Sequence, residues 1–160
     1  MPPVAFEKAL SSNSKVHLIN VTAGQWFWQF KDGGIMDDKN FKENNFNNQK
    51  STSINNNNQP SNKKEGITSS SSPFSSKPIK IKVGETVKFV ARSIDVNHGF
   101  GILKSSKSMD SPLIQMQVVP GFDNIFYYTF KGPGTFTIRC LEYCGWNHPY
   151  MVSQITVEAA

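Results

Sequence analysis

The chain has 160 residues, of which 38% are apolar and 12% aromatic, so it can form the hydrophobic core of one domain and is not disordered throughout. Residues 31–82 hold nine lysines against five acidic residues, and the remainder holds eight basic and seven acidic ones, so most of the net charge of +5 lies in one polar stretch. Because no recognition helix or aromatic–basic motif accompanies this charge, the composition argues against nucleic-acid binding. No run of 18 apolar residues occurs, so we expect no membrane-spanning segment in these residues, and residues 1–6 show neither the basic nor the apolar region of a signal peptide.

The first half of the chain combines one aromatic stretch with one polar stretch. Residues 1–30 end in the strand-like segment Gln25–Phe30, which is rich in Trp and Phe. Residues 33–77 consist mainly of Asn, Ser and Lys, including the runs Asn55–Asn58 and Ser69–Ser72. Ordering such a segment would bury little apolar surface against its backbone entropy. We therefore expect residues 33–77 to be a low-complexity surface loop inserted into a single domain that covers residues 1–160.

The second half of the chain has the pattern of short β-strands separated by Gly and Pro turns. No segment keeps a 3.6-residue period, whereas alternation with a period of two recurs in most of the stretches. This pattern predicts an all-β fold, an antiparallel β-sandwich. The predicted strands are residues 79–83, 86–91, 115–119, 124–130, 135–138 and 152–158.

Four sulfur- and nitrogen-bearing side chains fall within twelve residues, between two predicted strands: Cys140, Cys144, His148 and Met151. Thiolate and thioether are soft ligands, and a mixed S/N/S set suits copper. Zinc would prefer four Cys or His ligands, and a dithiol oxidoreductase would carry a CxxC motif with a helix. Each residue alone also has an ordinary structural interpretation: a local disulfide for the cysteines, a surface position for the histidine and core packing for the methionine.

The other two histidines differ in their surroundings. His98 lies just after a predicted strand, in the segment 93–100, where a loop can bring it over the cysteines. His17 lies in an N-terminal strand without such a context, so we interpret it as structural.

The pattern Cys-x-Glu-x-Cys-x3-His-x2-Met, preceded by Asp95-Val96-x-His98, resembles the dinuclear copper (CuA) site of subunit II of haem-copper cytochrome c oxidases. The aromatic segment 23–28, the strand start 83–87 and the turns 118–121 and 132–134 also match this family. The resemblance covers about residues 16–31 and 79–158, which leaves the polar insert outside. It implies a cupredoxin-like Greek-key β-sandwich.

The resemblance also implies a ligand set for two copper ions. Cys140 and Cys144 would be bridging thiolates, and His98 and His148 would be terminal imidazoles. Met151 would be a weak axial ligand, and the backbone carbonyl of Glu142 would lie opposite. The Glu142 side chain would face subunit I, near a magnesium site at the subunit interface.

The implied function is electron transfer in a terminal oxidase. The domain would accept single electrons from a small redox donor, either cytochrome c or a blue copper protein, and pass them toward haem in subunit I. Trp26 is expected to lie at the surface where electrons enter, within a mainly apolar docking patch in which only Asp95 and Glu142 match the family's carboxylates. As subunit II the chain would belong to an oxygen-reducing enzyme, but alone it has no ligands for oxygen chemistry.

Family members carry one or two N-terminal transmembrane helices, which this sequence lacks. We therefore expect a soluble fragment without its membrane anchor, whose native position is the extracytoplasmic face of the cell membrane. Two alternatives remain: a free mononuclear cupredoxin carrier, or the CuA domain of a nitrous oxide reductase. The second usually places Trp between the cysteines, where this sequence has Glu142.

Overall fold

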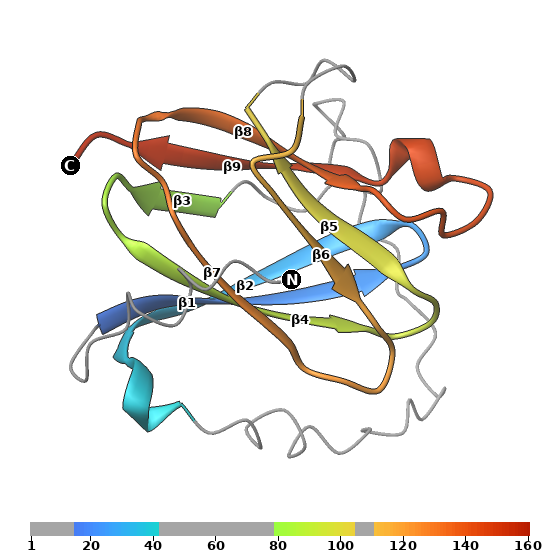
Figure 1. Ribbon diagram of the computed structural model, residues 1–160, viewed down its shortest axis with the longest axis horizontal. Helices are drawn as coiled ribbons and strands as arrows, with labels where there is room; N and C mark the ends of the chain where they lie inside the picture. Colours follow the sequence, from blue (N-terminus) through green and yellow to red (C-terminus); the bar gives the residue numbers. More distant parts are fainter. Residues whose placement is uncertain (1–14, 42–78, 105–110) are drawn as a thin grey trace, which may run out of the picture.

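Two β-sheets packed face to face make up the computed structural model, which describes residues 15–41, 79–104 and 111–160 (Figure 1). Within these ranges there are nine strands and two short 3-10 helices. The elements are β1 (Lys15–Gly24), β2 (Phe27–Asp37), η1 (Asp38–Asn40), β3 (Ile79–Lys82), β4 (Thr86–Ser93), β5 (His98–Leu103), β6 (Ile114–Val118), β7 (Asn124–Thr129), β8 (Gly134–Cys140), η3 (His148–Tyr150) and β9 (Val152–Glu158).

The strands form a four-stranded sheet, β2-β1-β4-β7, and a five-stranded sheet, β3-β9-β8-β5-β6. This arrangement confirms the predicted β-sandwich. The prediction that all strands pair antiparallel was wrong for two strand pairs, because β1 pairs with β4 in parallel and β3 pairs with β9 in parallel. Parallel pairs arise because the chain changes sheets between these strands, so the returning strand runs in the same direction as its neighbour.

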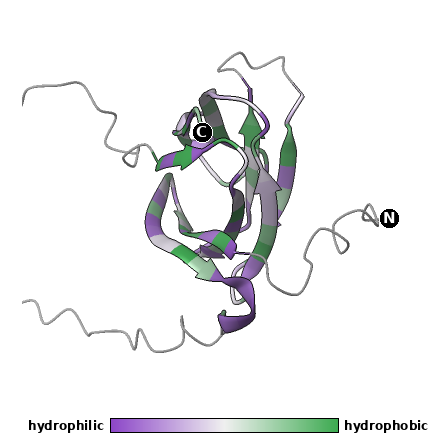
Figure 2. Ribbon diagram, turned by 90° about the vertical axis from the view of Figure 1, so that its left-hand side faces the viewer, coloured by the Kyte–Doolittle hydropathy of each residue, from purple (hydrophilic) through white to green (hydrophobic). Residues whose placement is uncertain are grey.

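The core lies between the sheets and is rich in aromatic rings. Phe89, Phe100 and Phe126 come from three strands, and their ring centroids lie 4.9–5.3 Å apart. Trp28 of β2 packs edge-on against Phe100 at 5.2 Å. Figure 2 shows apolar and polar positions alternating along the strands, as expected where one face is buried and the other solvated. The cysteines and Met151 belong to the same buried cluster, so the core continues into the predicted site.

The beginning of the predicted insert is part of the sandwich. β2 continues to Asp37, which pairs with Lys15, and a register shift opposite Leu18 accommodates Gly33 and Gly34. Gly34 has a φ of 75°, a conformation that glycine adopts without strain. The two glycines therefore form a bulge where the sequence predicted the end of the strand. Residues 42–77 of the predicted insert lie outside the described part of the chain.

A buried lysine holds η1 against the outer face of the four-stranded sheet. Lys88 of β4 is 4% exposed, and its Nζ lies 2.7 Å from Asp38 Oδ1 and 3.7 Å from the centroid of the Phe41 ring. The hydroxyl of Tyr127 also donates to Asp38. The charge of Lys88 is thus compensated by one carboxylate and one aromatic face.

His17 of β1 has the structural role that its sequence context predicted. Its two ring nitrogens lie 2.8 Å from Asp32 Oδ1 and 2.9 Å from Glu85 Oε2. Burial lowers the pKa of His17, but hydrogen bonds to Glu85 and Asp32 outweigh this effect, so the pKa is raised above its ordinary value. Among the residues that the structure describes, no helix is long and apolar enough to cross a membrane.

Candidate metal centre

The two cysteines lie side by side at one end of the core. Cys140 is the last residue of β8, and Cys144 lies in the loop that leads to η3. Their side chains are buried, both thiols are free, and the two Sγ atoms are 3.5 Å apart. A disulfide requires about 2.05 Å between its sulfurs, so this pair has the spacing of two separate sulfur ligands.

Each sulfur has its own imidazole. His98, the first residue of β5, is fully buried and places Nδ1 3.8 Å from Cys140 Sγ. His148 of η3 is half-buried and places Nδ1 3.5 Å from Cys144 Sγ. The same ring nitrogen therefore faces sulfur in both pairs, although the two histidines come from different parts of the chain.

Two further groups complete the cluster, one beside each sulfur. The Met151 thioether is buried, and its Sδ lies 3.8 Å from Cys144 Sγ. The Cys140 thiol donates to the backbone carbonyl of Glu142 at 3.1 Å. The Glu142 carboxylate instead points to Gln117, whose side-chain amide donates to it at 2.9 Å. All six predicted ligands are thus brought together in one cluster; their roles in metal binding remain a prediction.

Backbone contacts explain why the loop between β8 and β9 adopts this shape. The Cys140 amide donates to the carbonyl of Met151 at 3.2 Å, which closes the loop on itself. The Leu141 amide donates to the carbonyl of Gly99 at 2.8 Å, which holds the loop against β5. Gly145, with a φ of 121°, allows the sharp turn between Cys144 and His148.

Hydrogen bonding prepares His98 to bind a metal through Nδ1. Its Nε2 lies 2.8 Å from Asp95 Oδ1, and an Nε2–H donor to this carboxylate leaves Nδ1, which faces Cys140 Sγ, to bind a metal once its own proton is released. Burial raises the pKa of Asp95, but hydrogen bonds from His98 and from the amides of Gln25 and Val96 outweigh this effect. The pKa is therefore lowered below its ordinary value, and the carboxylate stays ionised.

The two thiols have opposite proton affinities. Burial raises the pKa of Cys140, but hydrogen bonds, first of all with His98, lower it to about 7. Burial and the neighbouring Cys140 raise the pKa of Cys144. Because two adjacent thiolates repel each other, both are deprotonated together only when a cation shares them. Sγ of the two cysteines and a ring nitrogen of His98 lie within 4.8 Å of one another, which is close enough for this. Soft sulfur and imidazole ligands of this kind suit copper.

Side chains of the β1–β2 hairpin contact the loop between β8 and β9, residues 141–151, which we call the cysteine loop; the sequence predicted such a position for Trp26 but not the contacts of Gln25 and Trp28. Trp28 Nε1 donates to the Met151 carbonyl at 3.3 Å. Trp26 Nε1 and Gln25 Nε2 both donate to the Cys144 carbonyl, at 3.2 and 2.9 Å. Trp26 lies in the turn between β1 and β2 and is partly buried, whereas Trp28 lies in β2 and is fully buried. The adjacent residues Gln25 and Trp26, which carry two side-chain N–H donors directly after a strand, were the sequence signal that could have predicted these contacts.

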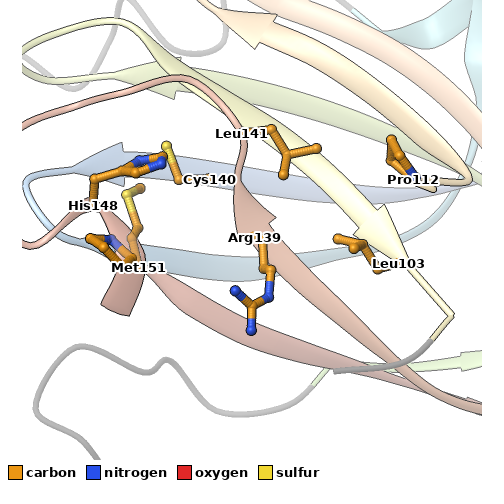
Figure 3. Close-up of a pocket in the computed structure, with 8 residues that line it drawn as sticks. Leu103, Pro112, Arg139, Cys140, Leu141, His148 and Met151 are labelled. Carbon is orange, nitrogen blue, oxygen red and sulfur yellow. The ribbon is translucent and has the colours of Figure 1, made fainter. Parts of the chain in front are cut away.

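A cavity of about 360 Å³ opens beside the cluster (Figure 3). In Figure 3 the side chains of Cys140, His148 and Met151 lie together at one end of it, and Arg139 lies apart from them. Leu103, Pro112, Leu141 and Pro149 provide its apolar lining.

A two-sheet sandwich with buried Cys, His and Met side chains gathered at one end defines a cupredoxin-like protein. Comparison with solved structures agrees: the periplasmic domain of subunit II of cytochrome oxidase from Bradyrhizobium japonicum aligns with a TM-score of 0.56 at 17% identity, covering 93% of this chain and 88% of that one. A haem-copper terminal oxidase dimer contains a chain that aligns with a TM-score of 0.50 at 20% identity, covering 91% and 71% of the two chains. At these identities the likeness shows the fold.

Among curated proteins the chain is similar to subunit 2 of cytochrome c oxidase. It is 36% identical to the Thermus thermophilus protein over 81 residues, which are 51% of this chain and 55% of that protein. A probable subunit 2 from Streptomyces avermitilis is 36% identical over 74 residues, 46% of this chain and 21% of that protein. The chain thus spans about half, or less, of the length of these relatives, and no family model matches it. The resemblance to oxidase subunit II is confirmed.

Proposed function

We propose that this domain holds a dinuclear copper centre and transfers single electrons as part of subunit II of a terminal oxidase. The observation that carries the proposal is the paired cluster: two buried thiols 3.5 Å apart, each with its own imidazole Nδ1 and its own weaker ligand. A mononuclear cupredoxin uses one cysteine, and the second buried thiol with its own histidine would then have no role.

The protein's contribution is to hold the ligands still. When bound, the copper pair supplies one-electron redox chemistry in which the charge is shared between two metals. Six groups of the chain would hold the copper pair: the two thiolates as shared ligands, the two imidazoles as one ligand for each metal, and the thioether and one backbone carbonyl as weaker ligands. They belong to Cys140, Cys144, His98, His148, Met151 and Glu142. The loop is fixed by backbone bonds to β5 and by indole and amide donors of the hairpin, so these atoms move little when the charge changes.

Electrons would enter through Trp26. Its indole nitrogen donates to the carbonyl of Cys144, so a single hydrogen bond connects the ring with the backbone of a bridging ligand. The donor would be a small redox protein, cytochrome c or a blue copper protein, and the acceptor would be haem in subunit I. On the native protein this face would lie outside the cell membrane, to which an N-terminal anchor would attach the domain.

The surface around the cluster favours a donor with an apolar contact face. Three aromatic side chains of the cysteine loop are 69–87% exposed: Tyr143, Trp146 and Tyr150. Asp95 is paired with His98 and Arg92 with Asp123 within the domain, and the Glu142 carboxylate accepts from the amide of Gln117. Such a surface attracts partners by apolar contact and contributes little electrostatic steering.

The Glu142 carboxylate would take part in a magnesium site at the interface with subunit I. Its support is its position: Glu142 follows Cys140 by two residues and is half-buried, and the amide of Gln117 holds its side chain at the edge of the cluster. A carboxylate oxygen is the ligand type that magnesium prefers.

Metal analysis of the reconstituted protein tests the proposal. We expect two copper ions per chain and an EPR spectrum with hyperfine splitting from two equivalent copper nuclei in the oxidised form. Cys144→Ser should remove this sharing, whereas Met151→Leu should keep both metals and shift the reduction potential, because axial ligands tune the site. One copper per chain with a four-line spectrum would favour the mononuclear carrier instead.

A further inference from the structure

The turn between β1 and β2 touches both segments that carry the cysteine cluster. On one side, Gln25 Nε2 donates to the carbonyl of Cys144 at 2.9 Å, and Trp26 shares that carbonyl. On the other side, the backbone amide of Gln25 donates to Asp95 Oδ2 at 2.6 Å. Gln25 is therefore bonded to the cysteine loop by its side chain and to the β4–β5 loop by its backbone.

Asp95 extends this connection to the first histidine. Its second carboxylate oxygen, Oδ1, accepts from His98 Nε2 at 2.8 Å and from the amide of Val96 at 2.7 Å. One carboxylate thus orients His98 and anchors the turn. A continuous chain of hydrogen bonds runs from His98 through Asp95 and Gln25 to the Cys144 carbonyl; we name Gln25 and Asp95 the brace.

Packing leaves the brace little freedom. A Cβ atom on Gly145 would lie 3.0 Å from Gln25 Nε2 and 3.1 Å from Trp26 Nε1, so the cysteine loop rests directly on the turn. The amide of Ile94 donates to the carbonyl of Ala23 at 3.0 Å, which ties the β4–β5 loop to the end of β1. The turn is therefore fixed on both sides and can set the separation between the two segments.

We propose that Gln25 is a positioning residue for the metal centre: through the brace it fixes Cys144 relative to His98 and so holds the two thiols in register. This inference rests on the proposed copper function, but it concerns hydrogen bonds of the chain itself. Gln25 touches no predicted ligand atom; it acts through the backbone carbonyl of Cys144. Groups that orient metal ligands in this way typically change metal affinity by about 10–100-fold when removed.

Three variants isolate the hydrogen bond. Gln25→Ala removes the amide, and Gln25→Met keeps its length and shape without a donor. Gln29→Ala is the matched control, since Gln29 is an exposed glutamine of the same hairpin. Gln25 is itself exposed, so neither of its substitutions should lower the unfolding free energy of the metal-free protein by more than the control does.

Two measurements separate positioning from stability. In the metal-free protein, the alkylation rate of Cys144 by a maleimide should rise at least about fivefold in both Gln25 variants, because a released loop opens more often. In the copper-loaded protein, copper loss to a chelator should become about 10-fold faster, and the reduction potential should fall, because the amide donor to the Cys144 backbone carbonyl has been removed. Gln29→Ala should change none of these values.

The outcomes distinguish this inference from the proposed function. Unchanged alkylation and unchanged copper loss in the Gln25 variants would overturn the role of the brace, whatever the copper content. Faster alkylation with unchanged copper loss and potential would also overturn it, since the bond would then close the loop without positioning the ligands. If the parent protein fails to hold two copper ions, the proposed function falls, and the alkylation rates alone then decide whether the brace fixes the cysteine loop.

Discussion

A methyl group at Gly99 should damage the site more than the same group two residues further along β5. A Cβ atom on Gly99 would lie 2.7 Å from the amide nitrogen of Glu142 and 3.0 Å from the carbonyl carbon of Leu141. Both atoms are backbone, so no side-chain rotation relieves the contact. Ordinary contact begins at 3.4 Å, and the cysteine loop would have to retreat by about 0.7 Å.

Such a retreat would weaken two contacts that shape the cluster. The 2.8 Å bond from the Leu141 amide to the Gly99 carbonyl would lengthen, and the Glu142 carbonyl would move away from Cys140 Sγ. We expect Gly99→Ala to lower the unfolding free energy by about 1–3 kcal/mol, the usual cost of overpacking. Copper affinity should fall as well.

Gly101→Ala is the matched control. Its Cβ would meet Leu141 Cδ1 at 2.2 Å and Cγ at 2.7 Å, but these atoms belong to a flexible side chain that lines the 360 Å³ cavity. Leu141 can turn into that space at about 1 kcal/mol or less. Both replacements of glycine lower the backbone entropy of the unfolded chain by about the same amount, so the difference in stability between the two variants isolates the clash.

Urea unfolding followed by tryptophan fluorescence measures both variants, and copper titration measures the site. The reasoning predicts a gap of at least about 1 kcal/mol between them, with weaker copper binding for Gly99→Ala alone. Equal stabilities and equal affinities would show that the loop yields freely, and the close approach of β5 would then have no bearing on the ligands.

Three further predictions concern charge and electron uptake. Because the pKa of His17 is raised, the stability that its protonated ring contributes is complete below pH 6.5 and is lost as pH rises through the raised pKa. The unfolding free energy of the parent should therefore fall across this pH range, and that of Asp32→Asn should fall less. Asp38→Asn should lower the unfolding free energy by about 3–5 kcal/mol, since it leaves the charge of Lys88 buried without its carboxylate, whereas Lys88→Met should cost clearly less in the same denaturation assay. Trp26→Ala should slow reduction of the domain by its natural donor in stopped-flow experiments, and the rate for the parent should depend little on ionic strength. An unchanged rate in the variant would remove Trp26 from the electron route. A steep salt dependence in the parent would show that charge steers docking.

The sequence by itself determined the kind of site and most of the strands. The ligands Cys140, Cys144, His148 and Met151 lie within one loop, so their spacing along the chain already limits how far apart they can be in space. Alternation with a period of two reflects local burial on one face of a strand, which is why β4 and β9 were predicted close to their observed bounds. Both patterns involve residues close together in the sequence, so they can be recognised without knowledge of the fold.

Only the tertiary structure decided which groups meet across the chain. That His98 faces Cys140 while His148 faces Cys144 depends on β5 lying next to β8. The bonds of Gln25 to Asp95 and to the Cys144 carbonyl join residues 70 and 119 positions apart. No spacing rule connects such residues, because their contact arises from the parallel pairing of β1 with β4 and from the way the two sheets pack, and both are properties of the whole folded chain.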